Sequence, residues 1–303
     1  LIVPNPNKPF QMKFKNILSL IAIAAVTLPG FTSCLGDNKD DDPNSQHSIS
    51  SLYIEQSKNM VVAAPVSGSG EVQTLPGCRI LLRVDNNDRT LAMSVADFQY
   101  DAQSRAEAFD YPAIPVTVNN NGFTANNATS VSCRGLYSTL EISNFHAEFK
   151  TRENGMQNLV ALNFVVNNKN HISIEFVNNE YKGVTSSSQL QQSSSVTFST
   201  REPNYLITFD RASKTLSITI DKPIFTATAP LNGAMVIAGV PYKFTPTGYE
   251  FAIDEVVPKI GGKTDDNMRI SSLTGTGVYG SSLNLSFDCY GINSRVTFSG
   301  NIY

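Results

Sequence analysis

Apolar and polar residues alternate with a period of two through most of the chain beyond residue 52, which is typical of strands with one buried face. Short polar segments rich in Asn, Gly and Ser separate these stretches and are typical of tight turns. Residues 79–95 and 205–220 each contain two alternating stretches around a polar turn with an Asp, which predicts two β-hairpins. No stretch keeps a convincing helical period for more than two turns, so the sequence predicts an all-β protein.

The same succession of segments occurs twice along the chain, at a spacing of roughly 125 residues. The matched pairs are 79–85 with 205–210, 89–95 with 214–220, 114–123 with 240–249, 140–143 with 268–271, 162–164 with 285–287 and 176–181 with 298–303. Single matches between β-patterned segments arise easily by chance, whereas an ordered series does not. The sequence therefore predicts two related domains.

Each copy offers about seven or eight strands joined by short turns, which favours an antiparallel meander. Such a sheet hides its edges either by closing into a barrel or by stacking against a second sheet. We favour tandem calycin-like barrels, with β-sandwiches as the alternative. The pattern predicts a first β-domain at 52–183, a flexible Ser- and Gln-rich linker at 184–194 and a second β-domain at 195–303.

The N-terminal residues have the features of an export signal. Residues 1–11 precede the first methionine and are interpreted as upstream, non-native sequence. Residues 12–33 form a predicted signal peptide, with Lys13 and Lys15 ahead of the apolar run 17–28. That run is shorter than the roughly 20 residues that span a bilayer, which favours a cleaved signal over a membrane helix.

Cys34 stands at the expected cleavage point, directly after the small residues Thr32 and Ser33. This arrangement resembles the lipobox of bacterial lipoproteins, in which signal peptidase II cuts before the cysteine and a diacylglyceryl group is attached to its sulfur. The resemblance implies that Cys34 is the site of lipid attachment and that the protein is anchored to a membrane through its N-terminus.

Residues 34–51 form an acidic tether that contains Lys39, Asp40 and Asp41. An acidic run beside a lipidated cysteine resembles the surface-export signal of Bacteroidetes lipoproteins. This resemblance implies a protein of the outer membrane, anchored by lipid and exposed at the cell surface.

Composition narrows the range of functions. The formal net charge is −3 and only 16% of residues are charged, which excludes nucleic-acid binding by phosphate neutralisation. The chain contains no Trp, the residue on which sugar-binding surfaces depend heavily. Of its four cysteines, Cys78 and Cys133 are the candidate pair for a disulfide within the first domain, and Cys289 continues a buried strand pattern.

The sequence carries no recognisable catalytic or cofactor motif. His146 and His171 lack neighbours at ligand spacing, and His47 lies in the tether, so no metal site is predicted. Residues 275–280 satisfy the pattern G-x-G-x-x-G, but the alternating residues that follow predict a strand instead of a nucleotide-binding helix. We expect no cofactor, no catalytic residues and no enzymatic activity.

The leading hypothesis is a non-enzymatic binding or display module whose extracellular ligand or protein partner is unknown. One alternative is a structural subunit, similar to a pilus anchor, that assembles through a strand edge. Another is a glycan-handling accessory protein or enzyme of a nutrient-uptake system. A barrel would also allow a small apolar ligand to be held in its mouth.

Overall fold

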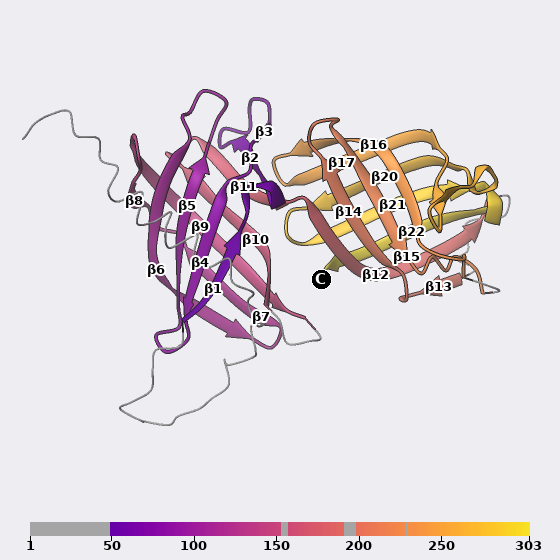
Figure 1. The fold of residues 1–303 in the computed structure, drawn as a ribbon, viewed down its shortest axis with the longest axis horizontal. Coiled ribbons are helices and arrows are strands. Elements are labelled where there is room, and N and C mark those ends of the chain that lie inside the picture. Colours follow the sequence, from indigo (N-terminus) through magenta and orange to yellow (C-terminus); the bar gives the residue numbers. More distant parts are fainter. Residues whose placement is uncertain (1–48, 153–156, 191–197, 228–229) are drawn as a thin grey trace, which may run out of the picture.

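The computed structural model describes residues 49–152, 157–190, 198–227 and 230–303. These residues form two eleven-stranded antiparallel sheets, and their helical content is limited to three short 3₁₀ segments. Strands β1–β11 form the first sheet and β12–β22 the second, and the two bodies lie beside each other in Figure 1. The predicted all-β class with two tandem antiparallel domains is confirmed.

The first sheet curls round in the order β1-β4-β5-β6-β7-β9-β10-β11-β2-β3, and β8 pairs with β9. Its strands are β1 (Ile49–Ile54), β2 (Asn59–Pro65), β3 (Gln73–Leu75), β4 (Arg79–Asp85), β5 (Thr90–Phe98), β6 (Glu107–Asn119), β7 (Gly122–Asn127), β8 (Val131–Arg134), β9 (Thr139–Thr151), β10 (Gln157–Val166) and β11 (Asn170–Phe176).

The second sheet closes into a barrel of eight strands, because β15 pairs with both β14 and β16. The ring runs β12-β14-β15-β16-β17-β20-β21-β22 and returns to β12, while β13 pairs with β12 and the β18–β19 hairpin with β16. The strands are β12 (Asn178–Gln189), β13 (Phe198–Thr200), β14 (Asn204–Asp210), β15 (Thr215–Asp221), β16 (Met235–Thr245), β17 (Gly248–Val256), β18 (Lys259–Ile260), β19 (Lys263–Thr264), β20 (Ile270–Val278), β21 (Ser282–Cys289) and β22 (Ser294–Ile302).

The two sheets share one strand order, but among the described strands only the second sheet closes into a ring. In the second, the start of β12 pairs with β14 and its remainder with β22. In the first, these two roles belong to β1, which pairs with β4, and to β2, which pairs with β11. The 3₁₀ turn η1 (Gln56–Lys58) separates β1 from β2, so one long strand of the second domain corresponds to two short ones in the first.

The two predicted hairpins are confirmed as β4–β5 and β14–β15, and they use the same turn. The Asp85 carboxylate accepts the backbone N–H groups of the residues two and three positions later, at 3.0 and 3.1 Å. Asp210 makes the same two contacts at 2.9 and 3.3 Å. These bonds satisfy turn N–H groups that would otherwise lack a partner in the protein.

The first five matched sequence segments lie in equivalent register on equivalent strands, except that residues 268 and 269 of the fourth match precede β20. The sixth match is wrong by two residues. Phe164 and Phe287 are equivalent, and their cross-strand partners are Ile172 and Val296. These cross-strand pairs fix the register of the last strand, and in that register the segment 176–181 is shifted by two residues relative to 298–303.

The predicted linker at 184–194 is wrong for residues 184–189, which belong to β12. A Ser-rich segment forms a strand here because its inward hydroxyls find partners. Thr185 Oγ1 lies 3.2 Å from the hydroxyl of Tyr205, and Ser187 Oγ donates to the carbonyl of Phe225 at 2.6 Å. The two sheets instead meet directly between β11 and β12, at Val177.

No helix in the described part of the chain has the length and apolar character needed to cross a membrane.

Candidate functional site

Large side chains fill the interior of both sheets. In the first, the rings of Tyr111 and Phe145 stack with centroids 4.6 Å apart. In the second, Tyr205 and Phe298 stack at 3.9 Å, and both are almost fully buried. Because these aromatic residues occupy the centres of the cores, they leave the outside of the sheets as the more accessible place for a binding surface.

The glycines of the G-x-G-x-x-G pattern serve the barrel core. The alternating residues that follow the pattern form strand β21, so the expectation of a strand there is confirmed, and Gly275 and Gly277 themselves lie in β20. A Cβ atom on Gly275 would lie 2.1 Å from the ring of Phe251, and one on Gly277 would lie 2.1 Å from the ring of Tyr249. Each glycine thus lets the aromatic ring of its cross-strand partner rest on the backbone.

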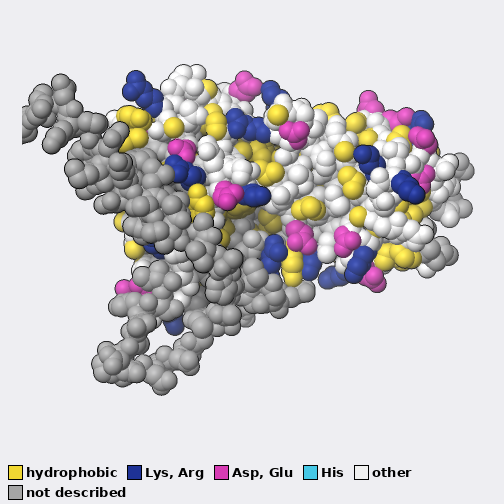
Figure 2. Space-filling view, in the orientation of Figure 1, with side chains coloured by type: hydrophobic (Ala, Val, Ile, Leu, Met, Phe, Trp, Pro, Cys, Tyr) yellow, Lys and Arg dark blue, Asp and Glu magenta, His cyan; other side chains and the backbone are white. Residues whose placement is uncertain are grey.

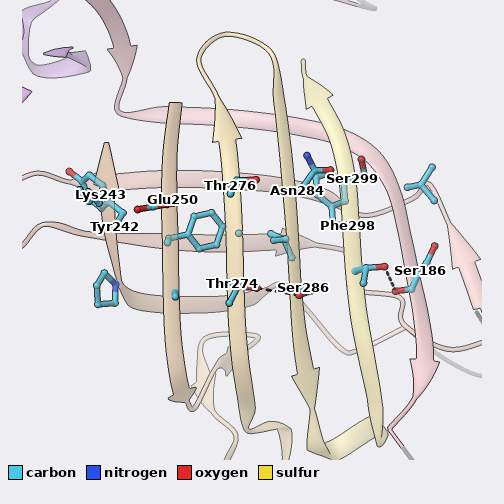
Figure 3. A pocket seen from close by; sticks show the side chains of 17 residues that line it. Ser186, Tyr242, Lys243, Glu250, Thr274, Thr276, Asn284, Ser286, Phe298 and Ser299 are labelled. Carbon is cyan, nitrogen blue, oxygen red and sulfur yellow. Dashed lines mark hydrogen bonds between the residues drawn. The ribbon is translucent and has the colours of Figure 1, made fainter. Parts of the chain in front are cut away.

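A broad, open groove of about 920 Å³ lies on the second barrel and is formed by six of its strands (Figure 3). The strands contribute mostly exposed hydroxyl and amide side chains, which alternate with the buried residues Phe251, Leu285 and Phe298. The lining residues are Val184, Ser186, Pro241, Tyr242, Lys243, Glu250, Phe251, Ala252, Thr274, Gly275, Thr276, Asn284, Leu285, Ser286, Thr297, Phe298 and Ser299.

Hydrogen bonds between groups of the groove are long. Thr274 Oγ1 and Ser286 Oγ are 3.3 Å apart, and Thr297 Oγ1 donates to the carbonyl of Ser186 at 3.4 Å. Both distances exceed the usual 2.7–2.8 Å for hydroxyl–oxygen pairs, so these contacts are weak. A ligand can therefore bind these donors and acceptors without breaking strong hydrogen bonds within the protein.

Charge in the groove is low and balanced. Lys243 and Glu250 are its charged lining residues, and they face each other in register on β16 and β17. Tyr242 is half-buried at the same end, where burial raises the pKa of its hydroxyl and the nearby Asp210 raises it further. These features favour a neutral polar ligand over a strongly charged one.

The first sheet packs against the second barrel through apolar side chains of β2 and β10. Met60, Val62 and Val160 belong to the hydrophobic core of the second barrel, although they lie on strands of the first sheet. Gly280 allows this approach, because a Cβ there would lie 2.5 Å from the Cβ of Ala161. The joint between the domains is therefore a packed apolar interface.

One carboxyl group is buried at this joint. Glu175 on β11 is 5% exposed and stands opposite Met60 in the ladder. Burial raises its pKa to about 8. Burial also raises the pKa of Tyr279, and a charge on Glu175 raises it further, which places the two groups near each other across the joint.

The residues predicted for membrane anchoring lie outside the described part of the chain. Cys34 and the export-signal residues Lys39, Asp40 and Asp41 all precede residue 49. Their assigned roles therefore stay predictions.

The three cysteines of the folded part are buried and free. Cys78 and Cys133 carry thiols, so the candidate disulfide between them is not formed in this structure. The Cys78 Sγ lies 3.9 Å from the amide oxygen of Asn59, which also accepts the Cys78 backbone N–H at 3.0 Å. Burial raises the pKa of Cys133 and of Cys289 to about 11, which keeps both as thiols near neutral pH.

No described contact joins His146 or His171 of the first domain to a nucleophilic side chain. The ring Nδ1 of His146 lies 2.6 Å from the amide oxygen of Asn126, and His171 is exposed on β11. Within the described ranges, no group of three or more His, Cys, Asp or Glu side chains could hold a metal ion.

On the face shown in Figure 2, acidic and basic side chains are interspersed over both domains.

Sequence reasoning missed both the groove and the buried carboxyl group. The hydroxyl and amide groups of the groove stand mostly at ordinary outward Ser, Thr and Asn positions of four strands, and the folded barrel brings these together with β16 and β17. Glu175 alternates with Ile172 and Ile174 like any outward polar residue. The signal that could have revealed it is that its strand also packs on a second domain.

No protein-family model and no curated protein matches this sequence. Among solved structures, the chain is similar to transferrin binding protein B from serogroup B Neisseria meningitidis, at 10% identity and a TM-score of 0.25, over 85% of this chain and 77% of that one. It is also similar to intact Ap-TbpB with N and C lobes, at 10% identity and a TM-score of 0.23, over 87% and 85% of the two chains. A double mutant of the Haemophilus parasuis Hp5 protein is similar at 8% identity and a TM-score of 0.22, over 85% and 76%.

Proposed function

We propose that this chain is a non-enzymatic binding module, anchored through a lipid on Cys34 at the outer face of an outer membrane, with the groove of the second barrel as its binding surface. The observation that supports this proposal is the make-up of that groove, in which Ser, Thr and Asn side chains from β12, β20, β21 and β22 share one open depression with side chains of β16 and β17. A surface of this kind supplies hydrogen bonds and shape complementarity, the two requirements of a recognition site.

The groove suits an uncharged, hydroxyl-rich ligand such as an oligosaccharide, bound mainly through hydrogen bonds in place of the Trp faces that the chain lacks. Its weakly bonded hydroxyls, on Thr274 and Ser286 for example, can exchange hydrogen bonds with sugar hydroxyls. The half-buried ring of Tyr242 adds an apolar face at one end. A strongly charged ligand would have little to pair with, since Lys243 and Glu250 balance each other.

Retention and turnover can be tested together by incubating the purified chain with a panel of neutral oligosaccharides. The proposal expects at least one oligosaccharide to be retained and recovered with unchanged mass. Products of smaller mass would show an enzyme and contradict the proposal. Absence of retention across the panel would remove the oligosaccharide as the ligand class.

Assembly through a strand edge is the second candidate, and one observation favours it. Among the described strands, the six-residue β1 pairs with β4 alone, so within that part of the chain its other edge is open to a further strand. A synthetic peptide with the sequence of β4 tests this edge. Binding of the peptide to the intact chain, together with no retention of oligosaccharides, would favour assembly over ligand binding.

A further inference from the structure

An exposed apolar pair stands on the loop that joins β8 and β9 of the first sheet. Leu136 is 41% exposed and Tyr137 is 61% exposed. Of the large hydrophobic residues that the described chain exposes, these two are the only ones adjacent in sequence. We call residues 135–138 the tip loop.

A buried carboxylate holds the tip loop in place. Glu107 is 3% exposed at the start of β6, and its oxygens point at the loop. One oxygen accepts the backbone N–H of Tyr137 at 2.9 Å, and the other accepts the hydroxyl of Ser138 at 2.7 Å. Removing a carboxylate from water is unfavourable unless hydrogen bonds compensate for the lost hydration. Glu107 forms these compensating bonds with an exposed loop and thereby fixes its position.

The backbone of the loop is equally constrained. The N–H of Gly135 donates to the carbonyl of Ser138 at 2.7 Å and closes the turn. A Cβ on Gly135 would lie 2.5 Å from that carbonyl oxygen and 2.8 Å from the Glu107 carboxylate. Only glycine fits there, so the exposed pair is carried by a loop with one preferred shape.

A cation accompanies the exposed ring. The guanidinium carbon of Arg105 lies 5.6 Å from the centroid of the Tyr137 ring. Arg105 is exposed, so its donors can reach a carboxylate on another molecule. The second barrel has no such loop at the matching place, where it carries β18, β19 and η2 (Asp266–Met268) instead.

We infer that the tip loop is a preformed contact for a partner protein, one that offers an apolar pocket for Leu136 and Tyr137 with carboxylates at its rim for Arg105. Tyr and Arg dominate the energetics of protein interfaces, and an anchor already held in its bound shape loses less entropy on binding. A lipid surface fits less well, because two side chains on a fixed loop bury too little apolar area to hold a protein there. This surface belongs to the first sheet and is separate from the groove.

Photocrosslinking at the cell surface tests the inference. The full chain carries p-benzoylphenylalanine in place of Tyr137, and a control carries it in place of Tyr290, which is 55% exposed on the second barrel. The inference expects one discrete protein adduct from position 137 that is absent from position 290. Adducts with lipid only, with a second copy of the chain, or equally at both positions would overturn it, as would the absence of any adduct.

The identified partner is then purified and its affinity measured. Tyr137→Ser should weaken binding by about tenfold or more, whereas Tyr290→Ser should leave it unchanged. Both changes are at exposed positions, so the melting temperature of each variant should match that of the unmodified chain. Equal affinity of the Tyr137→Ser variant and the unmodified chain would show that the crosslink reports proximity alone and would overturn the inference.

Discussion

Arg89 and Lys214 occupy the same place in two copies of one turn, with φ values of 51° and 53°. Both are in the left-handed region, which residues with a side chain seldom adopt. The carbonyl of Arg89 accepts the N–H of Val116 at 2.8 Å, and that of Lys214 accepts the N–H of Tyr242 at 3.5 Å. The two domains therefore share backbone geometry at a position where their side chains differ, as expected of a duplicated domain.

The aspartate of each turn should contribute equally to its own domain. We expect Asp85→Ala and Asp210→Ala each to lower the urea concentration at the midpoint of unfolding, because each removes two hydrogen bonds to turn N–H groups. Urea denaturation measures the change, and Arg211→Ala in the same turn is the control. A neutral result at either aspartate would contradict the equivalence of the turns.

Alanine should not be tolerated at Gly277. Its Cβ would lie 2.1 Å from the ring of Tyr249, which is buried and cannot move aside freely. We expect Gly277→Ala to lower the free energy of unfolding by about 3 kcal/mol. Thr276→Ala, on the outward face of the same strand, should change it by less than about 0.5 kcal/mol. Calorimetry of both variants would show whether packing of the Tyr249 ring against the backbone requires glycine at position 277.

Burial of Glu175 makes stability depend on pH. Its pKa is raised from 4.5 to about 8 in the folded protein, so the folded state binds this proton more tightly than the unfolded state does. The contribution is fully present below pH 4.5, falls as the pH rises from there to about 8, and is lost above that. The slope from one group is at most about 1.4 kcal/mol per pH unit.

Denaturation curves across that range provide the check on Glu175. The Glu175→Gln variant should lose most of the decline in stability between pH 5 and pH 8, because an amide does not titrate. Glu202→Gln, an exposed control, should keep it. An unchanged pH profile in Glu175→Gln would contradict the account, because the decline would then come from groups other than Glu175.

The lipid anchor can be tested by metabolic labelling with a radioactive fatty acid. We expect Cys34→Ala to remain unlabelled and to appear in the periplasm as a soluble protein, because the sulfur of Cys34 is the predicted site of acylation. Continued labelling of the variant would contradict the assignment. Cys78→Ala serves as the matched control and should label like the unmodified chain.

The sequence reveals structure where side-chain alternation and turn chemistry act locally. The period-two patterns around Asp85 and Asp210 predicted both hairpins, and the repeat predicted a shared strand order. Strand β12 escaped prediction because its buried positions Thr185 and Ser187 are polar, and their partners lie far away in sequence.

The candidate sites depend on contacts that no local pattern encodes. The groove collects outward residues from six strands, so its existence follows from closure of the barrel. The tip loop depends on Glu107, which lies about thirty residues before the Tyr137 backbone that it binds. Contacts between residues so far apart in the sequence leave no periodic pattern in it.

Isothermal titration with an oligosaccharide retained from the panel tests the central claim most directly. Thr276→Trp places a bulky ring in the groove, while Ser217→Trp places the same ring on β15, which contributes no lining residue. The account predicts that the unmodified chain and Ser217→Trp bind with equal affinity and that Thr276→Trp binds about tenfold or more weakly. Equal binding by all three proteins would contradict it, because the ligand would then lie elsewhere on the molecule.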